Sequence, residues 1–480
     1  MAIHRAYAYN PRPSPCRVLQ IMSAPRLHFD AETLFALLRM SIPMVISQGA
    51  FALMIFTDRY FLAQLGPAHM AAALGGGVAC YFSYSLFNGV LAYANALVAQ
   101  YLGAGEPGKC SKVVTQGMLL TVACIPLLAV IALLMRQIFT AMQHSPEQAE
   151  LEIIYYDIMM FCTFFTLVKV VLASFFSGIG NTRIVMICDV LGILINIPLA
   201  YGLIFGAFGL PELGIAGAAW GTVLSSIFAV VIFLAFYLAR SNRVRFAINQ
   251  SLVFDAGIIR RYLRLGFPSG VEMFLNVAAF NLFLLMFQGY GIAEAASATI
   301  VFNWDILSFV PLVGLSIAVM SLIGNAVGSG DMSRATAITT AGYMLGLGYS
   351  LILAITYVSF RNPLVEMFIF QDTEADAIRT LSRFMMVGLS CYVLCEGVLQ
   401  VAAGVLRGAG DTHWVMYASV TLHWAMLVSQ YFIIKVFELG PRVSWVGFVI
   451  MVLMIMVVFL YRLLGNRWRD PERLRAVMAE

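Results

Sequence analysis

The sequence predicts an all-α polytopic membrane protein whose twelve transmembrane helices form two pseudo-symmetric six-helix bundles. The composition is 61% hydrophobic and 11% charged, with a mean hydropathy of +0.87. Soluble domains are about 45–50% apolar and about 25% charged. Apolar stretches of roughly 20 residues, the length that a helix needs to cross a bilayer, recur along the whole chain. Landmark residues of the first half also return at a fixed spacing in the second half.

The expected spans are separated by turn residues and charges, a pattern typical of helices. The strands of a membrane barrel would give weaker alternating segments of about ten residues. The segment PELG at 211–214 must be the turn between the fifth and sixth spans. The twelve expected spans are 40–63, 71–99, 113–135, 151–176, 184–208, 213–239, 263–288, 295–326, 333–359, 378–406, 413–437 and 442–466.

An internal repeat relates the two halves. The motif SGIGNT at 177–182 returns as RGAGDT at 407–412, which is 230 residues later. Six spans per half keep both halves in the same orientation, so a pseudo-two-fold axis along the membrane normal should relate them. Two like bundles that face each other enclose a cleft able to open to either side, which favours a transporter. Three further landmark pairs lie 225 residues apart: Pro43 and Pro268, Gly66 and Gly291, and Gly103 and Gly328.

The distribution of basic residues predicts the orientation in the membrane. Of the 29 Lys and Arg residues, 21 fall on the side of both termini, 5 on the opposite side and 3 within spans. Cytoplasmic loops carry such an excess, so we expect both termini in the cytoplasm. As the location we expect a bacterial inner membrane. The expected parts are a tail (1–39), an N-lobe (40–239), a linker (240–262), a C-lobe (263–466) and a tail (467–480).

Several function classes have no support in the sequence. No Walker A motif occurs, so we expect neither an ATP motor nor an ATPase subunit. Cys391 and Cys395 are one helical turn apart, but no His or second Cys pair completes a metal site. No His/Asp or Ser/His constellation points to an enzyme. The net charge of +4 reflects the loop bias and not nucleic-acid binding. We expect a monomer in membrane lipid, with small organic substrates and no cofactor.

Motifs over roughly 40–415 resemble those of the multidrug and toxic compound extrusion (MATE) transporters. They are IPMVISQ…FTDRYFLAQLG, VAQYLGAGE, FFSGIGNTR, LGFPSG, LIGNAVGSGD and, most specifically, GVLRGAGDT. The resemblance implies twelve helices in two lobes, and export of amphipathic, often cationic, organic compounds in exchange for Na+ or H+. The superfamily also contains flippases of lipid-linked saccharides, so that function is the alternative. A flippase would need a cationic cleft, whereas acids outnumber bases within the spans.

Glu396 is the first candidate for binding the coupling ion. A charge at the bilayer centre costs roughly 2.5–3.5 kcal/mol, so such a residue should face a cleft or a partner. Glu396 lies in the tenth expected span, 11 residues before Arg407. The resemblance implies a cation-binding carboxylate at this position. Gln400, one turn further on, should line the same site. A structural ion pair between Glu396 and Arg383 is the alternative.

Three more carboxylates are candidates for the coupling ion. The resemblance places Asp58 at the helix 1 acid of the family, with a helix cap or ion pair as the alternative. A further family acid corresponds to Asn276, one turn after Glu272, so the polar site would be shifted by about one turn. Asp305 would join Glu272 and Glu396 in a three-carboxylate cluster that holds Na+ or shared protons. A surface or substrate-facing acid is the alternative for Asp305.

Residues near these acids complete the expected site. Asn303, close to Asp305, is a supporting polar candidate. The acid Asp189 is expected at a solvated helix end. Aromatic side chains can hold organic cations, although facing lipid is the alternative for each of them. The cleft candidates in the second span are Tyr81, Tyr84 and Phe87. Both Na+ and H+ need carboxylates, so either coupling ion fits.

Overall fold

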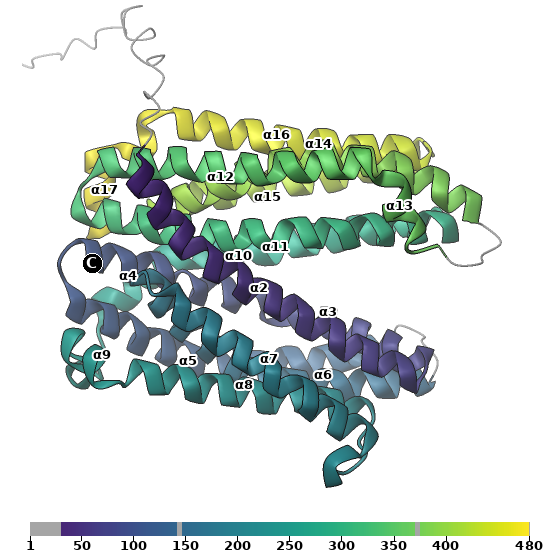
Figure 1. Ribbon diagram of the computed structural model, residues 1–480, viewed down its shortest axis with the longest axis horizontal. Helices are drawn as coiled ribbons and strands as arrows, with labels where there is room; N and C mark the ends of the chain where they lie inside the picture. The colour runs from purple at the N-terminus through teal and green to yellow at the C-terminus, as the bar shows by residue number, and fades with distance from the viewer. Residues whose placement is uncertain (1–29, 142–145, 370–374, 480) are drawn as a thin grey trace, which may run out of the picture.

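The computed structural model describes residues 30–141, 146–369 and 375–479, which are almost entirely helical (Figure 1). No strand occurs in these ranges. The helices of the first half are α2 (Ala31–Leu65), α3 (Pro67–Ala92), α4 (Ala94–Gly103), α5 (Pro107–Ala141), α6 (Pro146–Gly178), α7 (Thr182–Phe205), η1 (Ala207–Gly209) and α8 (Ile215–Tyr237). The remaining elements are α9 (Arg240–Arg245), η2 (Ile248–Gln250), α10 (Ala256–Gln288), α11 (Ile292–Ser329), α12 (Met332–Ser359), α13 (Arg361–Glu366), α14 (Ala375–Gly408), α15 (Thr412–Tyr431), η3 (Phe432–Val436), α16 (Pro441–Leu464), η4 (Asn466–Arg469) and α17 (Pro471–Met478).

The predicted all-α membrane fold is confirmed, and the count of twelve spans is approximate. Within the described ranges, eleven helices are long and apolar enough to cross a membrane, and α3 and α4 together make one of these. α15, at 20 residues, covers most of the expected span 413–437 but is not among these eleven, and it packs against α10 and α16. The chain turns between the fifth and sixth spans at 206–214, as the PELG segment predicted.

Local sequence signals fix many of the helix ends. The Asp30 carboxylate accepts hydrogen bonds from the backbone of the first turn of α2, and Asp255 and Asp331 do the same for α10 and α12. Such caps satisfy N–H groups that have no partner inside the helix. Gly206 and Gly330 end α7 and α11 with φ angles of +69° and +74°, a region that glycine adopts without a steric cost.

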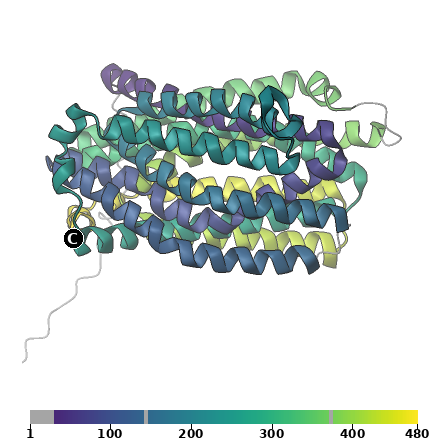
Figure 2. The ribbon, with the colours of Figure 1, turned by 90° about the horizontal axis from the view of Figure 1, so that it is seen from below.

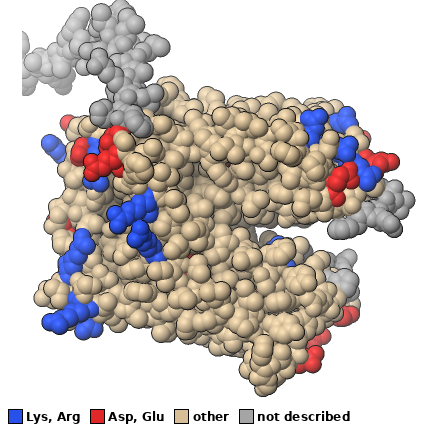
Figure 3. Space-filling model, viewed as in Figure 1, with Lys and Arg blue, Asp and Glu red and all other residues tan. Residues whose placement is uncertain are grey.

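The two halves meet at one end of the molecule and separate at the other. The long helices run side by side between these ends (Figure 2). We call the end that carries α4, α9 and α17 the closed end. At the opposite, open end the surface is hollowed by a deep notch between the halves (Figure 3). The described chain begins and ends at the closed end, where many Lys and Arg side chains also gather. The molecule is therefore open towards one side only.

Reciprocal glycine contacts join the halves at the seam, the surface along which they meet. A Cβ on Gly103 would lie 2.1 Å from the Asn325 carbonyl oxygen, and a Cβ on Gly328 would lie 2.0 Å from that of Gln100. These two contacts exchange under the 225-residue shift, so the sequence repeat is a spatial two-fold relation. Only glycine permits such close backbone approach. The same shift relates a second pair of contacts: Gly89 with Gly270, and Gly314 with Val45.

Each half begins with a helix whose first turns lie in the other half. We call the buried cluster around Leu97, Leu172 and Phe175 the first core, and the one around Val319, Val401 and Leu406 the second core. The first core includes Ile258, Tyr262 and Leu265 of α10, and the second core includes Leu37 and Met40 of α2. This exchange explains why the closed end is tightly joined.

The segments expected as tails and linker contain helices. α2 begins at Ala31, within the expected N-terminal tail, while residues 1–29 lie outside the described ranges. α10 begins at Ala256, within the expected linker. The expected C-terminal tail contains most of η4 and all of α17. It folds because Trp468 is fully buried and Val477 is 7% exposed.

Candidate functional site

The structure brings Asp305 and Glu396 together inside the second half. Asp305 lies on α11 and Glu396 on α14, and these two helices pack against each other. The two carboxylates are close enough to interact electrostatically. Asp305 Oδ1 and Glu396 Oε2 are buried without a hydrogen-bond partner in the described ranges, and neither residue forms an ion pair there. Burying unpaired charge is costly, so a proton or a cation bound at this pair would stabilise it.

Polar groups of two helices surround the acid pair. Tyr392, one turn before Glu396 on α14, directs its hydroxyl towards Asp305. Tyr357 of α12 lies close enough to interact with both carboxylates. The Ser350 hydroxyl on α12 faces Gly397, the residue after Glu396, and is buried and unpartnered in the described part of the chain. Sequence reasoning missed these residues, although the four-residue spacing between Tyr392 and Glu396 was a usable signal.

The alternative ion pair for Glu396 is not formed. Arg383 instead binds Glu366, at 2.9 Å. Gln400 is half-buried on α14 as expected, one turn from Glu396. Asn303 is exposed and donates to the Thr299 carbonyl, so it does not support Asp305. Two residues along a helix correspond to a rotation of about 200°, which places Asn303 and Asp305 on different faces.

The expected three-carboxylate cluster is wrong, because Glu272 lies elsewhere. Its carboxylate pairs with Arg407 at 2.8 Å. Arg407 is 11 residues after Glu396 on α14, a rise of about 16 Å. In the described ranges no group of three or more His, Cys, Asp or Glu residues could hold a metal ion. Asn276, one turn from Glu272, donates to the Ser419 hydroxyl at 2.8 Å.

A second buried acid, Asp58, lies in the first half. Its side chain is 6% exposed and accepts a hydrogen bond from Thr222 Oγ1 at 3.2 Å. Asn196 of α7 donates to Ser225 of α8, at 3.4 Å. Asp58 Oδ1 and Asn196 Oδ1 are buried and unpartnered within the described residues. The oxygens of α2, α7 and α8 in this region suit a proton or a hard cation.

The two acid sites are not related by the repeat. Asp58 and Asn196 correspond to Phe283 and Met426, which are buried in an apolar cluster of the second half. Asp305 corresponds to Cys80 at the 225-residue shift. Glu396 corresponds to Thr166 at the 230-residue shift. The fold is therefore two-fold symmetric while its buried charges are not.

The candidate aromatic residues of α3 differ in exposure. Tyr81 is 38% exposed and contacts Tyr84 edge to face. Tyr84 is half-buried and packs against the first core. Phe87 is only 6% exposed and belongs to that core, so its expected place in the cleft is wrong for this conformation.

Another acid of the first half is paired. Asp189 accepts a hydrogen bond from Ser47 and forms an ion pair with Lys169 at 3.3 Å. Its side chain is 14% exposed, so the expectation of a solvated helix end is wrong. The pairing with Lys169 sets Asp189 apart from Asp58, Asp305 and Glu396, which have no basic partner in the described ranges.

Comparison with known proteins identifies the family. The family model MatE matches residues 43–202 and 268–432, one block in each half. The chain belongs to the MATE family. Its members are transporters, so this MATE protein is a multi-pass integral membrane transporter, and its family favours a role other than catalysis.

Solved structures of the superfamily share the fold of this MATE transporter. A MOP superfamily transporter from Pyrococcus furiosus, described as having a binding pocket of reversed polarity, superposes with a TM-score of 0.82 at 20% identity. An outward-facing MATE family multidrug-resistance transporter also gives 0.82 at 20% identity. In both comparisons the match covers 93% of this chain and 97% of the other.

Proposed function

We propose that this MATE transporter exports amphipathic, often cationic, organic compounds in exchange for Na+ or H+. The observation that carries the proposal is the pair of Asp305 and Glu396, which are half-buried, each have one buried and unpartnered carboxylate oxygen, and have no basic partner in the described ranges. A permanent structural role would be served better by an ion pair such as that of Asp189 with Lys169. Unpaired carboxylates in a membrane protein are suited to an ion that comes and goes.

Alternating access would couple the entry of the cation to the export of the organic substrate. An external cation enters from the open end and binds between Asp305 and Glu396, which removes their mutual repulsion. The neutralised site then favours rearrangement of α11 and α14, and the organic substrate leaves through the open end. Moving one positive charge inwards yields about 2.3 kcal/mol per 100 mV of membrane potential.

Asp58 would provide a second ion site. Its free oxygen and the Asn196 side-chain oxygen are unpartnered in the described part of the chain, and Thr222 adds a hydroxyl. Such oxygens can hold Na+, and the carboxylate alone can hold a proton. Two unrelated acid sites allow more than one ion per transport cycle.

The proposal includes a location and an orientation. We place the protein as a monomer in a bacterial inner membrane, with the closed end in the cytoplasm. The excess of basic residues on the side of the termini supports this orientation. The notch at the open end would then face outwards (Figure 3).

The test is dye efflux from proteoliposomes with an imposed Na+ gradient or an imposed pH gradient. Wild type, Glu396→Gln and Asp305→Asn are compared with Glu212→Gln, a control that changes an exposed acid at the open end. We expect one gradient to drive efflux in wild type and the control, with a loss of at least about tenfold in both site variants. Normal gradient-driven efflux by Glu396→Gln would refute the assigned role.

The flippase alternative gives a different result. A flippase of lipid-linked saccharides would move a short-chain pyrophosphate-linked saccharide lipid between leaflets, and neither gradient would drive the efflux of organic cations. That combination would replace the efflux proposal.

A further inference from the structure

The C-terminal helix α17 contacts both halves of the molecule. Trp468, just before the helix, is buried in the second core, and Leu474 packs against the same core. Val477, three residues after Leu474, is buried in the first core. Only η4 separates α17 from α16, and because it contacts both cores α17 crosses the seam at the closed end (Figure 1).

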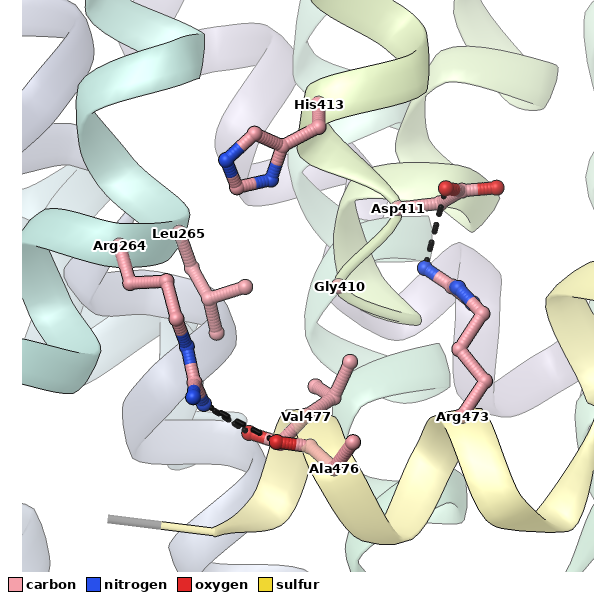
Figure 4. Close-up of a pocket in the computed structure, with 8 residues that line it drawn as sticks. All are labelled: Arg264, Leu265, Gly410, Asp411, His413, Arg473, Ala476 and Val477. Atoms are coloured by element: carbon pink, nitrogen blue, oxygen red, sulfur yellow. Dashed lines mark hydrogen bonds and ion pairs between the residues drawn. The ribbon is translucent and has the colours of Figure 1, made fainter.

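Two arginines of α10 hold the end of α17. Arg261 donates to the Val477 carbonyl at 3.0 Å, and Arg264 donates to the Ala479 carbonyl at 2.8 Å (Figure 4 shows the position of Arg264). The last carbonyls of a helix lack internal partners and carry partial negative charge, so guanidinium groups satisfy them well. Arg261 is 1% exposed and also donates to Gln100 of α4, at 2.6 Å. The same arginine thus joins α17 to the first half.

The start of α17 is held by the second half. Arg473 pairs with Asp411 at 3.1 Å, and Arg462 of α16 binds the same carboxylate at 2.8 Å. Figure 4 shows the pair of Arg473 and Asp411 towards one end of α17 and Arg264 of α10 at the other end. A cavity of about 270 Å³ lies among α10, the 410–411 loop and α17. The helix is therefore attached at both ends, with open space beside it.

The contacts below α17 are those that must break when the closed end opens. Tyr93 donates to the Arg407 carbonyl at 3.1 Å, and Gln100 donates to the Gly408 carbonyl at 2.8 Å. Ser321 of α11 donates to a carbonyl of α6 at 2.8 Å. Each bond crosses from one half to the other, and α17 bridges the same seam from outside.

We propose that α17 is a latch that holds the closed end shut and must release α10 before that end can open. The proposal rests on the alternating access proposed above. The charged attachment through Asp411 keeps α17 with the second half. Release therefore occurs on the side of α10. Val477 leaves the first core, and the hydrogen bonds from Arg261 and Arg264 to the carbonyls at the end of α17 break.

The experiment measures opening without measuring transport. Ser321→Cys places a thiol of similar size at the seam, where Ser321 is 2% exposed. Full-length protein in lipid nanodiscs is treated with a hydrophilic maleimide, and the labelled fraction at position 321 is followed by mass spectrometry. Val477→Asp puts a charge into the first core, and Arg264→Ala removes the bonds from an exposed side chain. The matched control is Ser241→Asp, which adds the same charge at an exposed position of the closed end away from α17.

We expect slow labelling in the parent and the control, and labelling about 5- to 150-fold faster in Val477→Asp and Arg264→Ala. Equal labelling rates in all four proteins would overturn the latch. If Val477→Asp does not fold, Arg264→Ala decides alone, since its side chain is on the surface. Because the readout needs no substrate and no gradient, a failed efflux assay would leave this result intact.

Discussion

At the scale of single residues, the partner of an acid matters more than its position in the sequence. Glu272 and Glu396 have the same chemistry and both lie inside helices. Glu272 binds Arg407, whereas Glu396 faces another acid, Asp305. An ion pair contributes to the fold, while two like charges in a buried site oppose it. The two glutamates should therefore respond differently to the same substitution.

Glu272→Gln should lower stability, and Glu396→Gln should not. The first change leaves the partly buried Arg407 without its carboxylate, at a cost of about 1–3 kcal/mol. The second removes a charge that has no partner in the described ranges. Thermal unfolding midpoints in one detergent at neutral pH would test this. Equal drops for the two variants would contradict the assignment of partners.

Tyr392→Phe should weaken binding of the coupling ion while keeping the fold. The ring packs in the apolar cluster with Trp445 and Phe448, and phenylalanine preserves those contacts. The Tyr392 hydroxyl lies beside Asp305 and has no hydrogen-bond partner in the described residues, so it is free to bond that carboxylate when the ion binds, and a hydrogen bond to a charged group is worth about 1.5–3 kcal/mol. We expect the ion concentration for half-maximal efflux to rise about tenfold or more. Tyr461→Phe, at an 81% exposed position, is the control and should behave as wild type.

At the scale of helices, glycines set how closely the halves approach. α4 and α11 touch backbone to backbone at Gly103 and Gly328, and α3 and α10 do so at Gly89 and Gly270. These helix pairs form the seam, so its fit depends on the absence of a Cβ. Interiors are close-packed, and a single added carbon cannot be absorbed there without a shift of the backbone.

Gly328→Ala should loosen the closed end. The new Cβ would lie 2.0 Å from the Gln100 carbonyl oxygen, so the helices must move apart. In the first turn of α5, Gly108→Ala places its Cβ with no atom within 4 Å and serves as the control. Both changes are made in the Ser321→Cys protein, and we expect faster labelling of the introduced thiol in the first variant only, by about 5- to 150-fold. A rate unchanged by Gly328→Ala would show that the seam opens independently of this contact.

At the scale of the whole molecule, one end is sealed and the other is notched. The first turns of α2 and α10 are exchanged between the cores, and α17 bridges the same region. The open end is hollowed where these connections are missing (Figure 3). Access to each side can therefore be followed with reagents that do not cross membranes.

Single cysteines should report the orientation. Glu212→Cys lies in the exposed turn at the open end, and Ser241→Cys lies in the exposed linker at the closed end. We expect an impermeant maleimide to label the first in intact cells and the second only after permeabilisation, compared with the parent protein. The reverse pattern would mean that the termini are outside and that the notch faces the cytoplasm.

The sequence by itself determined the class of fold and most of its elements. Apolar stretches of bilayer length can satisfy their backbone hydrogen bonds only as helices, so the spans could be predicted without knowledge of tertiary contacts. The 225-residue spacing of Gly103 and Gly328 likewise predicted the two-fold relation between the halves, because glycine permits two backbones to approach closely. The ionisable residues within spans also stood out, and Glu396 and Asp305 are among them.

Only the tertiary structure decided which of these charges are paired. Helical spacing gives the face of one helix, but not the rotation and height of its neighbour. For this reason the sequence predicts Glu272 beside Glu396, whereas in the structure Glu272 binds Arg407. Likewise, the sequence predicts a solvated Asp189, whereas in the structure Asp189 binds Lys169. The sequence did not predict the helix α17 for the same reason. Eight residues form a stable helix only when other segments supply burial and partners, and here the two cores and α10 supply them.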